Sequence, residues 1–196
     1  DKPSGLPVQG GSGVRISIID AVERDFGFKP FLVHRLDKDT SGCLVVARSQ
    51  RAAAVYARIF ESRSCVKRYR AIVAGSPELD SFDISDEVNV RGLAMSAETS
   101  VRVLSRFAGF SWLELILVTG RTHQARLHLG GKGLPIVADD RHGDFAVNKR
   151  VAKEYGARRL VLCACRIVLP GGIDVSAGEP AHIAAFLDVL GVREGR

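Results

Sequence analysis

Apolar residues recur along the chain with two periods, one typical of helices and one typical of strands. Helical spacing of apolar positions predicts helices at residues 14–26, 50–61, 122–129 and 181–190. Apolar runs and alternating patterns predict strands at residues 31–33, 43–47, 67–74, 99–107, 110–119 and 160–169. Two of these strands flank Ala108-Gly109, which predicts an antiparallel pair. Segment 76–98 is predicted to be loop-rich with short strand candidates, and segment 139–157 to be a long polar connection.

Strands dominate this pattern, and the helices are interspersed without the regular strand–helix alternation of a parallel sheet. The layer rule therefore favours an α+β fold, a mixed and mostly antiparallel β-sheet with flanking helices. We find no internal repeat, low-complexity tract or linker that divides the chain. We expect a single domain over residues 1–196.

The composition narrows the classes of function. Of the 196 residues, 46% are hydrophobic and 26% are charged, which is typical of a globular protein. The formal net charge is +6, and Arg supplies 21 of the 28 cations. Arg binds phosphate in a bidentate manner, so this bias favours a polyanionic partner, although a genome that prefers Arg codons explains it equally well. We see no apolar run of the ~18 residues that a membrane span needs, no secretory signal, and no metal-type or disulfide-type spacing of the cysteines.

The most unusual segment is HRLDKDTSG at residues 34–42, which places charged side chains between two apolar strands. A solvated hairpin loop is the ordinary explanation for such polarity. Here the apolar flanks anchor the loop close to the interior on both sides. Asp37 follows the apolar Leu36, so its carboxylate is a candidate nucleophile or base. Arg35 lies two residues before Asp37 and faces the same side of an extended segment.

A second candidate is TGRTHQARLHL at residues 119–129, which lies at a predicted strand-to-helix turn. The unpaired amides at the start of a helix favour an anion site there. Helical geometry puts Thr122, His123 and Arg126 on one face. His123 and His128 are five residues apart and fall on different faces, which disfavours a metal site built on two histidines.

Two shorter segments each leave two interpretations open. KRYR at residues 67–70 begins a strand with exposed cations, and alternation puts Tyr69 on the face opposite Arg68 and Arg70. This arrangement suits base stacking beside phosphate contacts, and equally an amphipathic edge strand. DDRHGD at residues 139–144 is similar to a metal-binding carboxylate cluster, and equally to a salt-bridged turn.

Taken together, these segments resemble the ribosomal large-subunit pseudouridine synthases of the RluA, RluC and RluD group. The matching pieces are DKPSG at 1–5 with the glycines of 10–13, HRLDKDTSG at 34–42, KRY at 67–69, TGRTHQAR at 119–126 and DDRHGD at 139–144. Their order and spacing match from the first residue to about residue 187. The Gly-rich and DDRHGD pieces are most similar to the RluC branch.

The resemblance implies an enzyme that isomerises uridine to pseudouridine in RNA, by family default large-subunit ribosomal RNA, with no cofactor and no metal. The family fold has a central active-site cleft. The family's catalytic aspartate falls on Asp37, and the basic residue that keeps this carboxylate ionised falls on Arg126. The tyrosine that stacks on the target base falls on Tyr69, and the arginine that helps hold the target nucleotide out of the RNA stack falls on Arg35.

Many members of this family carry a small RNA-binding domain before the catalytic domain. In this chain, which starts at Asp1, that domain is expected to be absent or not covered. We expect a cytoplasmic monomer that acts on RNA and does not associate with a membrane. Four positions outside the catalytic set depart from the family pattern, namely Gln9, Ala125, Leu134 and Cys163.

Two other functions stay open as hypotheses. The first is a non-catalytic RNA-binding module on the same scaffold. The second is a metal-dependent phosphoesterase built from Asp37, Asp39, Asp139, Asp140 and His142. A chelator would abolish the activity of the phosphoesterase and would leave a pseudouridine synthase active.

Overall fold

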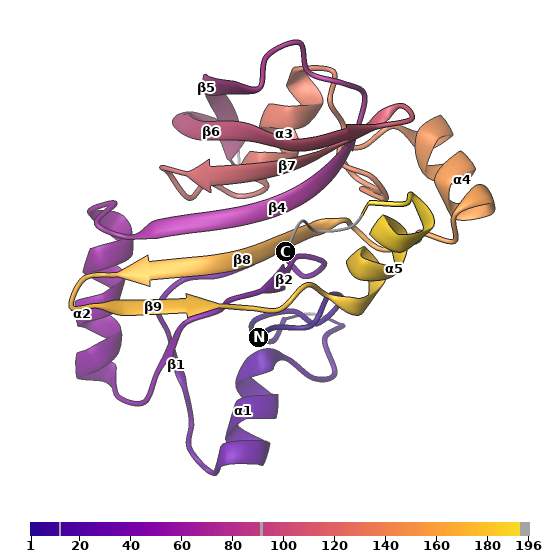
Figure 1. The fold of residues 1–196 in the computed structure, drawn as a ribbon. Coiled ribbons are helices and arrows are strands. Elements are labelled where there is room, and N and C mark those ends of the chain that lie inside the picture. Colours follow the sequence, from indigo (N-terminus) through magenta and orange to yellow (C-terminus); the bar gives the residue numbers. More distant parts are fainter. Residues whose placement is uncertain (12, 91, 193–196) are drawn as a thin grey trace. The chain divides into compact units, whose positions relative to one another are not determined.

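A computed structural model describes residues 1–11, 13–90 and 92–192 of the chain. The chain divides into two compact units (Figure 1). The first unit consists of Asp1–Lys67 and Ala164–Gly178, and the second of Arg68–Cys163 and the residues from Glu179 onward. Position 12, within the Gly-rich segment of the family resemblance, lies outside the described residues.

The first unit combines two helices with short strands. The helices are α1 (Ile18–Phe26) and α2 (Gln50–Glu61). The strands are β1 (Phe31–Leu32), β2 (Ser41–Gly42), β3 (Val46–Ala47), most of β8 (Leu162–Leu169) and β9 (Ile173–Ser176). β1 pairs antiparallel with β3, and β8 pairs antiparallel with β9 and has β2 as a neighbour. These short strands leave much of the unit to loops, including the turn between β1 and β2.

Capping residues set the boundaries of both helices in this unit. The Ser17 hydroxyl accepts the backbone N–H of Asp20, and the Asp20 carboxylate accepts the backbone N–H of Ser17. This capping box satisfies two of the donors that a helix start leaves unpaired. Gly27 ends α1 in the left-handed conformation, and the Ser49 hydroxyl caps α2.

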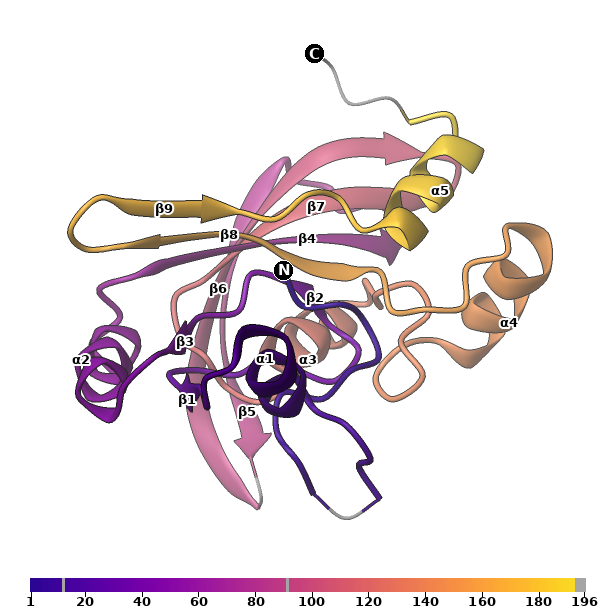
Figure 2. The same cartoon turned by 90° about the horizontal axis from the view of Figure 1, so that it is seen from below.

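The second unit is built on an antiparallel sheet. Its strands follow one another in the order β4 (Val66–Ala74), β7 (Phe110–Leu117), β6 (Leu93–Phe107) and β5 (Ser81–Val90). Its helices are α3 (Gln124–Gly131), α4 (Phe145–Glu154) and α5 (Ala181–Val189). Phe186 of α5 packs edge-on against Phe110 of β7, with 5.9 Å between ring centroids. Both views show α4 standing at the margin of the unit, clear of its strands (Figures 1 and 2).

The structure confirms the α+β class and the antiparallel pair across residues 108 and 109. It also confirms the helix over residues 50–61. The strand expected over 43–47 is shorter, because only its last two residues belong to β3. No helix in the described ranges is long and apolar enough to cross a lipid bilayer.

Segment 76–98 contains strands, as predicted, but the prediction that it is loop-rich was wrong, because the segment contains all of β5 and the start of β6. In β5 only Ile84 and Val88 are buried among the ten described residues. Phe82, Ile84, Val88 and Val90 nevertheless alternate with polar residues, and Asp86 is the one polar residue on their face of the strand. The paired backbone of β6, which meets β5 over ten residue pairs, carries the strand past this break in the pattern.

The prediction for segment 139–157 was also wrong, because α4 lies inside it. Of the ten described residues of α4, Val151 is the one that is buried, so the helix has almost no apolar stripe. Two smaller corrections concern α3 and β4. α3 begins at Gln124, because His123 adopts a left-handed φ of 56° that a helix does not allow. Lys67, expected to be exposed, is 7% exposed because strand alternation turns it inward.

Candidate active site

The segment 34–42 folds into a tight turn that carries Asp37. The backbone N–H of Thr40 donates to the carbonyl of Asp37 over 3.2 Å, and β2 begins at the next residue. Leu36 and Thr40 are buried, whereas Arg35 is exposed and Asp37 is half-buried. Leu36 therefore anchors the turn, with the exposed Arg35 and the half-buried Asp37 on either side of it.

Lys2 lies beneath this turn and holds it to the N-terminal segment. Its side chain is almost fully buried, and Nζ donates to the carbonyls of Pro3, Leu6 and Lys38 over 2.9, 2.7 and 2.8 Å. The backbone of Lys2 also exchanges two hydrogen bonds with Gly42, of 2.8 and 2.9 Å. Lys2 thus contacts the turn at its middle and at its end.

The electrostatics of Lys2 follow from this burial. Burial lowers the pKa of Lys2 to about 8, although the negative charges of Asp39 and Asp37 oppose the shift. Three carbonyl acceptors around Nζ match the three N–H donors of an ammonium group. At neutral pH the turn therefore has a positive charge fixed below its carboxylates.

The two ends of the turn are fixed by a histidine and a glycine. Nε2 of His34 accepts the backbone N–H of Val45 over 2.9 Å, and the ring stacks on Phe60 of α2 at 4.2 Å between centroids. Burial, together with the charge of Lys67, lowers the pKa of His34 to about 4, so the ring is neutral and can accept this bond. Gly42 has a φ of 103°, and a Cβ there would overlap the carbonyl of Ala164. Only glycine therefore fits at position 42 with this backbone conformation.

Tyr69 lies on β4 in the second unit, opposite Leu115 of β7. Burial alternates along the start of β4, with Lys67 and Tyr69 buried and Arg68 and Arg70 half-buried. The predicted division of these four side chains between two faces is therefore present. On the second face, Nη1 of Arg68 donates to a carboxylate oxygen of Glu114 over 2.9 Å.

Arg126, also in the second unit, is held by the carboxylate of Asp139, which the sequence analysis assigned to the separate segment 139–144. It is 3% exposed, and its Nε and Nη2 donate to the two oxygens of Asp139 over 2.7 and 2.6 Å. One oxygen of Asp139 also accepts the backbone N–H groups of Arg141 and His142, each over 3.0 Å. Two guanidinium contacts and two backbone contacts therefore fix both partners of the pair.

The charge state of this pair follows from its contacts. Burial alone would raise the pKa of Asp139, but hydrogen bonds from Arg126, His142 and Arg141 outweigh burial and lower it. Asp139 is therefore a carboxylate at neutral pH, and the guanidinium of Arg126 has one fixed orientation. A cation of fixed orientation suits a site that must hold a second negative group.

The residues around Arg126 form two further contacts. Nδ1 of His123 and Nε2 of His142 are 2.8 Å apart, which requires one ring to donate and the other to accept. The buried side chain of Gln124 accepts from the Thr119 hydroxyl and from the backbone N–H of Arg121, over 2.7 and 2.9 Å. The expected common face of Thr122, His123 and Arg126 is absent among the described residues, because the first two precede the helix.

Residues 1–130 match a family model described as RNA pseudouridylate synthase. The chain belongs to the RNA pseudouridylate synthase family. The matched residues include both the Asp37 turn and the TGRTHQAR segment. The family resemblance inferred from the sequence is therefore confirmed.

Relatives of known name agree with this membership. The chain is 36% identical over 95% of its length to ribosomal large subunit pseudouridine synthase C of Vibrio cholerae, and covers 64% of that protein. It is 34% identical to the Escherichia coli protein of the same name, covering 96% of this chain and 63% of the relative. Mitochondrial RNA pseudouridine synthase 4 of Arabidopsis thaliana is 36% identical, with 92% of this chain and 46% of the relative covered. The chain thus spans about half to two thirds of the length of these relatives.

A solved structure is similar over the whole chain. The human RNA pseudouridylate synthase domain containing 4 superposes with a TM-score of 0.85 at 26% sequence identity. The superposition covers 100% of this chain and 90% of the human one. The architecture of this chain is therefore that of the family.

Sequence reasoning missed two residues that position this family's motifs. Lys2 is recognisable in the sequence only as part of the DKPSG piece, and nothing in its neighbourhood indicates that its ammonium group is buried. Asp139 was weighed as a metal ligand or as part of a turn, without a link to Arg126 thirteen residues earlier. Segments 119–126 and 139–144 both belong to the family pattern, and this was the one sign of a link between Arg126 and Asp139. The pattern gives no distance between the two segments.

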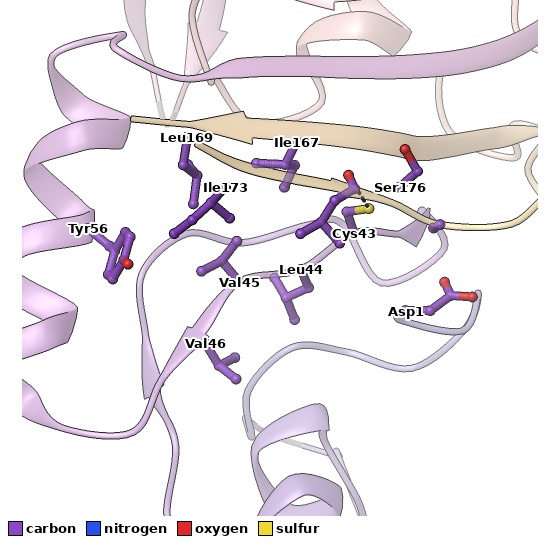
Figure 3. A pocket seen from close by; sticks show the side chains of 12 residues that line it. Asp1, Cys43, Leu44, Val45, Val46, Tyr56, Ile167, Leu169, Ile173 and Ser176 are labelled. Carbon is purple, nitrogen blue, oxygen red and sulfur yellow. Dashed lines mark hydrogen bonds between the residues drawn. The ribbon is translucent and has the colours of Figure 1, made fainter. Parts of the chain in front are cut away.

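An apolar pocket in the first unit is a different feature from these motifs. It has a volume of about 300 Å³ and is lined by residues 43–46, by β8 and β9, and by Tyr56 of α2 (Figure 3). Large apolar pockets are the usual first guess for a ligand site. Here the lining does not include Arg35 or Asp37, and burial raises the pKa of its one thiol, Cys43. The pocket therefore does not contain the residues that the family resemblance assigns to catalysis.

The phosphoesterase hypothesis gains no support from the geometry. Its proposed ligand Asp139 has both oxygens occupied by Arg126 and by two backbone N–H groups. Within the described ranges, no three His, Cys, Asp or Glu side chains gather as a metal site would require. The segment 139–144 instead forms a turn whose first carboxylate is bound to an arginine.

Proposed function

We propose that this chain is the catalytic domain of an RNA pseudouridine synthase, with Asp37 as the catalytic carboxylate. The observation that carries the proposal is the family match over residues 1–130, which contains the Asp37 turn. The half-buried position of Asp37 on an anchored turn supports it. A carboxylate that attacks a nucleotide must be accessible and must also be held in one place.

The reaction exchanges one bond of the uridine for another. The bond between N1 of uracil and C1′ of ribose breaks, and a bond between C5 and C1′ forms. C5 loses a proton and N1 gains one, so the balance needs no co-reactant. Asp37 attacks the target nucleotide or breaks its glycosidic bond, and the detached uracil then turns and rejoins through C5.

Three further residues are proposed to serve this step. Arg126, oriented by Asp139, supplies the positive charge that keeps the catalytic carboxylate ionised. Tyr69 stacks on the target base, and Arg35 helps to hold the target nucleotide outside the RNA helix. The base must leave the stack, because the uracil ring cannot turn while neighbouring bases enclose it.

The proposed substrate is large-subunit ribosomal RNA. Two of the relatives above have that substrate in their names. The net charge of +6 suits an RNA partner, because phosphate contacts dominate the binding of nucleic acids. We further propose that the protein acts as a monomer in the cytoplasm.

Release of tritium from large-subunit ribosomal RNA labelled at C5 of uridine tests the proposal. Wild type should release tritium in the presence of EDTA, and Asp37→Asn should release none while its affinity for RNA stays within a few-fold. Asp39→Asn is the matched control, because Asp39 is an exposed carboxylate on the same turn. We expect this control to keep most of the wild-type rate.

Each outcome separates the proposal from its competitors. Substantial release by Asp37→Asn would refute the role of Asp37. Binding of the RNA without release by wild type would favour the non-catalytic binding module. Loss of wild-type release in EDTA would favour a metal-dependent reaction.

A further inference from the structure

Helix α4 presents an outward stripe of one aromatic and two cationic side chains. Phe145, Lys149 and Lys153 are spaced four residues apart, so they lie along one face of the helix. All three are exposed, and Phe145 is 82% exposed. Val151 and Asn148, on the other side of the helix, are buried and half-buried. We call Phe145, Lys149 and Lys153 the α4 stripe.

The charge around this stripe is strongly positive. Residues 140–159 contain six Lys and Arg residues and three Asp and Glu residues, which gives half of the chain's formal charge of +6 within twenty residues. No salt bridge among the described residues includes Lys149 or Lys153. Like charges four residues apart destabilise a helix, so the lysine pair does not serve the stability of α4. Such a pair is stabilised when an anion binds between or beside the two groups.

The exposed ring of Phe145 adds a second kind of contact. A single exposed apolar residue is ordinary on a protein surface. Phe145, however, shares its face with Lys149 and Lys153 and precedes them by one and two helical turns. An aromatic ring beside cations is the arrangement that proteins use to stack an unpaired base while they hold the phosphates of the same strand. This combination favours a single-stranded nucleic acid over an acidic protein.

α4 is firmly attached to the segment that holds Arg126. The amide of Asn148 accepts the backbone N–H of Ala138 over 2.8 Å and donates to the carbonyl of Asp139 over 2.9 Å. Asp139 in turn binds Arg126 through both carboxylate oxygens. Gly143, just before the helix, lies so close to the carbonyl of Asp139 that a Cβ would overlap it. The stripe and Arg126 therefore belong to one hydrogen-bonded body within the second unit.

We propose that the α4 stripe binds the RNA strand that flanks the target uridine, with Lys149 and Lys153 on phosphates and Phe145 against an unpaired base. This inference rests on the proposed function, because it takes RNA as the substrate. The stripe contributes affinity and placement of the RNA, and it has no part in the bond exchange.

Titration of a fluorescently labelled fragment of large-subunit ribosomal RNA, repeated over a range of salt concentrations, tests this proposal. Lys149→Gln with Lys153→Gln should weaken binding about tenfold and reduce the slope of log affinity against log salt by about 1.4, or ~0.7 for each lost phosphate contact. Phe145→Ala should weaken binding by about tenfold with an unchanged slope, because stacking releases no counterions. Both variants should keep the wild-type melting temperature, because the side chains are exposed.

A matched control is available on α2 in the first unit. Arg51 and Arg58 are also exposed, lie on one helix and carry the same total charge. Arg51→Gln with Arg58→Gln should leave the affinity within twofold of wild type.

The proposal is overturned if the lysine variant binds RNA as wild type does, or if the α2 control loses as much affinity. It is also overturned if the affinity falls while the salt slope stays the same, because phosphate contact would then be absent. The titration measures binding alone, so it decides the role of the stripe even when no RNA fragment releases tritium. Failure of the proposed function and failure of this inference are therefore distinguishable.

Discussion

Replacement of Asp139 by Asn isolates the contribution of the Arg126–Asp139 pair. The two residues are 3% and 2% exposed, so neither charge is solvated when its partner is lost. Asn keeps the size of the side chain, but it loses the charge and turns an N–H donor toward the guanidinium donors. Removal of one member of a buried ion pair costs about 3–5 kcal/mol, because the remaining charge is uncompensated. We expect the free energy of unfolding at pH 7 to fall by this amount.

Urea denaturation followed by tryptophan fluorescence measures this change directly. Trp112, the one tryptophan of the chain, lies on β7 in the same unit as the pair and is buried. The matched control is Asp140→Asn, which removes the same charge from the neighbouring exposed residue. That control should change the free energy of unfolding by less than about 0.5 kcal/mol. A loss below about 1 kcal/mol for Asp139→Asn would show that the pair does not stabilise the fold as a buried ion pair does.

The acid dependence of the same variant gives a second, independent check. Because the pKa of Asp139 is lowered in the folded state, the unfolded chain takes up this proton at a higher pH. The stabilisation is therefore complete above the ordinary aspartate pKa of about 4, and it is lost as the pH falls through the folded pKa. Asp139→Asn lacks this group, so its deficit relative to wild type should shrink below about pH 4.

Two further substitutions test the Asp37 turn. Gly42→Ala should lower the free energy of unfolding, measured by urea denaturation, by about 3 kcal/mol or more, because a strained backbone and an overlap with a carbonyl add together. Gly109 also has a positive φ but faces open space, so Gly109→Ala should lower it clearly less. Equal losses in the two variants would contradict the overlap at Gly42. His34→Gln should remove part of the loss of stability on acidification. The pKa of His34 is lowered to about 4 in the folded chain, whereas the unfolded ring takes up its proton near pH 6.5, so acid favours the unfolded chain. Wild type should lose about 3 kcal/mol more than this variant between pH 6.5 and pH 4, and parallel pH profiles would contradict the assignment.

A helix or strand is predictable from the sequence when it buries many apolar side chains. α2 and β7 have clear patterns, since their apolar side chains lie on one side or form a run. α4 buries one side chain, and in β5 Asp86 interrupts the alternation of Phe82, Ile84, Val88 and Val90, so the pattern predicts neither element over its full length. Their stability comes from backbone pairing with β6 and from capping by Asp144, whose carboxylate accepts the N–H of Val147. Such contributions depend on partners that a local pattern does not contain.

Some residues of the candidate site are also recognisable from the sequence, and others are not. The blocks around Asp37 and Arg126 are recognisable because several unusual residues occur together in a fixed order. The residues that hold these blocks in place were not recognisable, because a lysine or an aspartate in the sequence gives no sign of its burial. Ionised side chains are rarely buried, so the prior for Lys2 and Asp139 favoured the surface. Only the surrounding acceptors and donors reverse that expectation, and two of them, the Lys38 carbonyl and the Arg126 guanidinium, come from other segments of the chain.

Buried charges act together with apolar anchors such as Leu36 to orient the candidate site residues of this protein. Lys2 has three carbonyl acceptors, and Asp139 has four N–H donors, so each buried ion is matched by directional contacts. Apolar packing tolerates many side chains of similar volume, whereas a charged hydrogen bond fixes an angle as well as a distance. A substitution that keeps the volume of Lys2 or Asp139 but removes the charge should therefore misplace the Asp37 turn or Arg126. Function at these two positions is thus expected to be more sensitive to charge than to size.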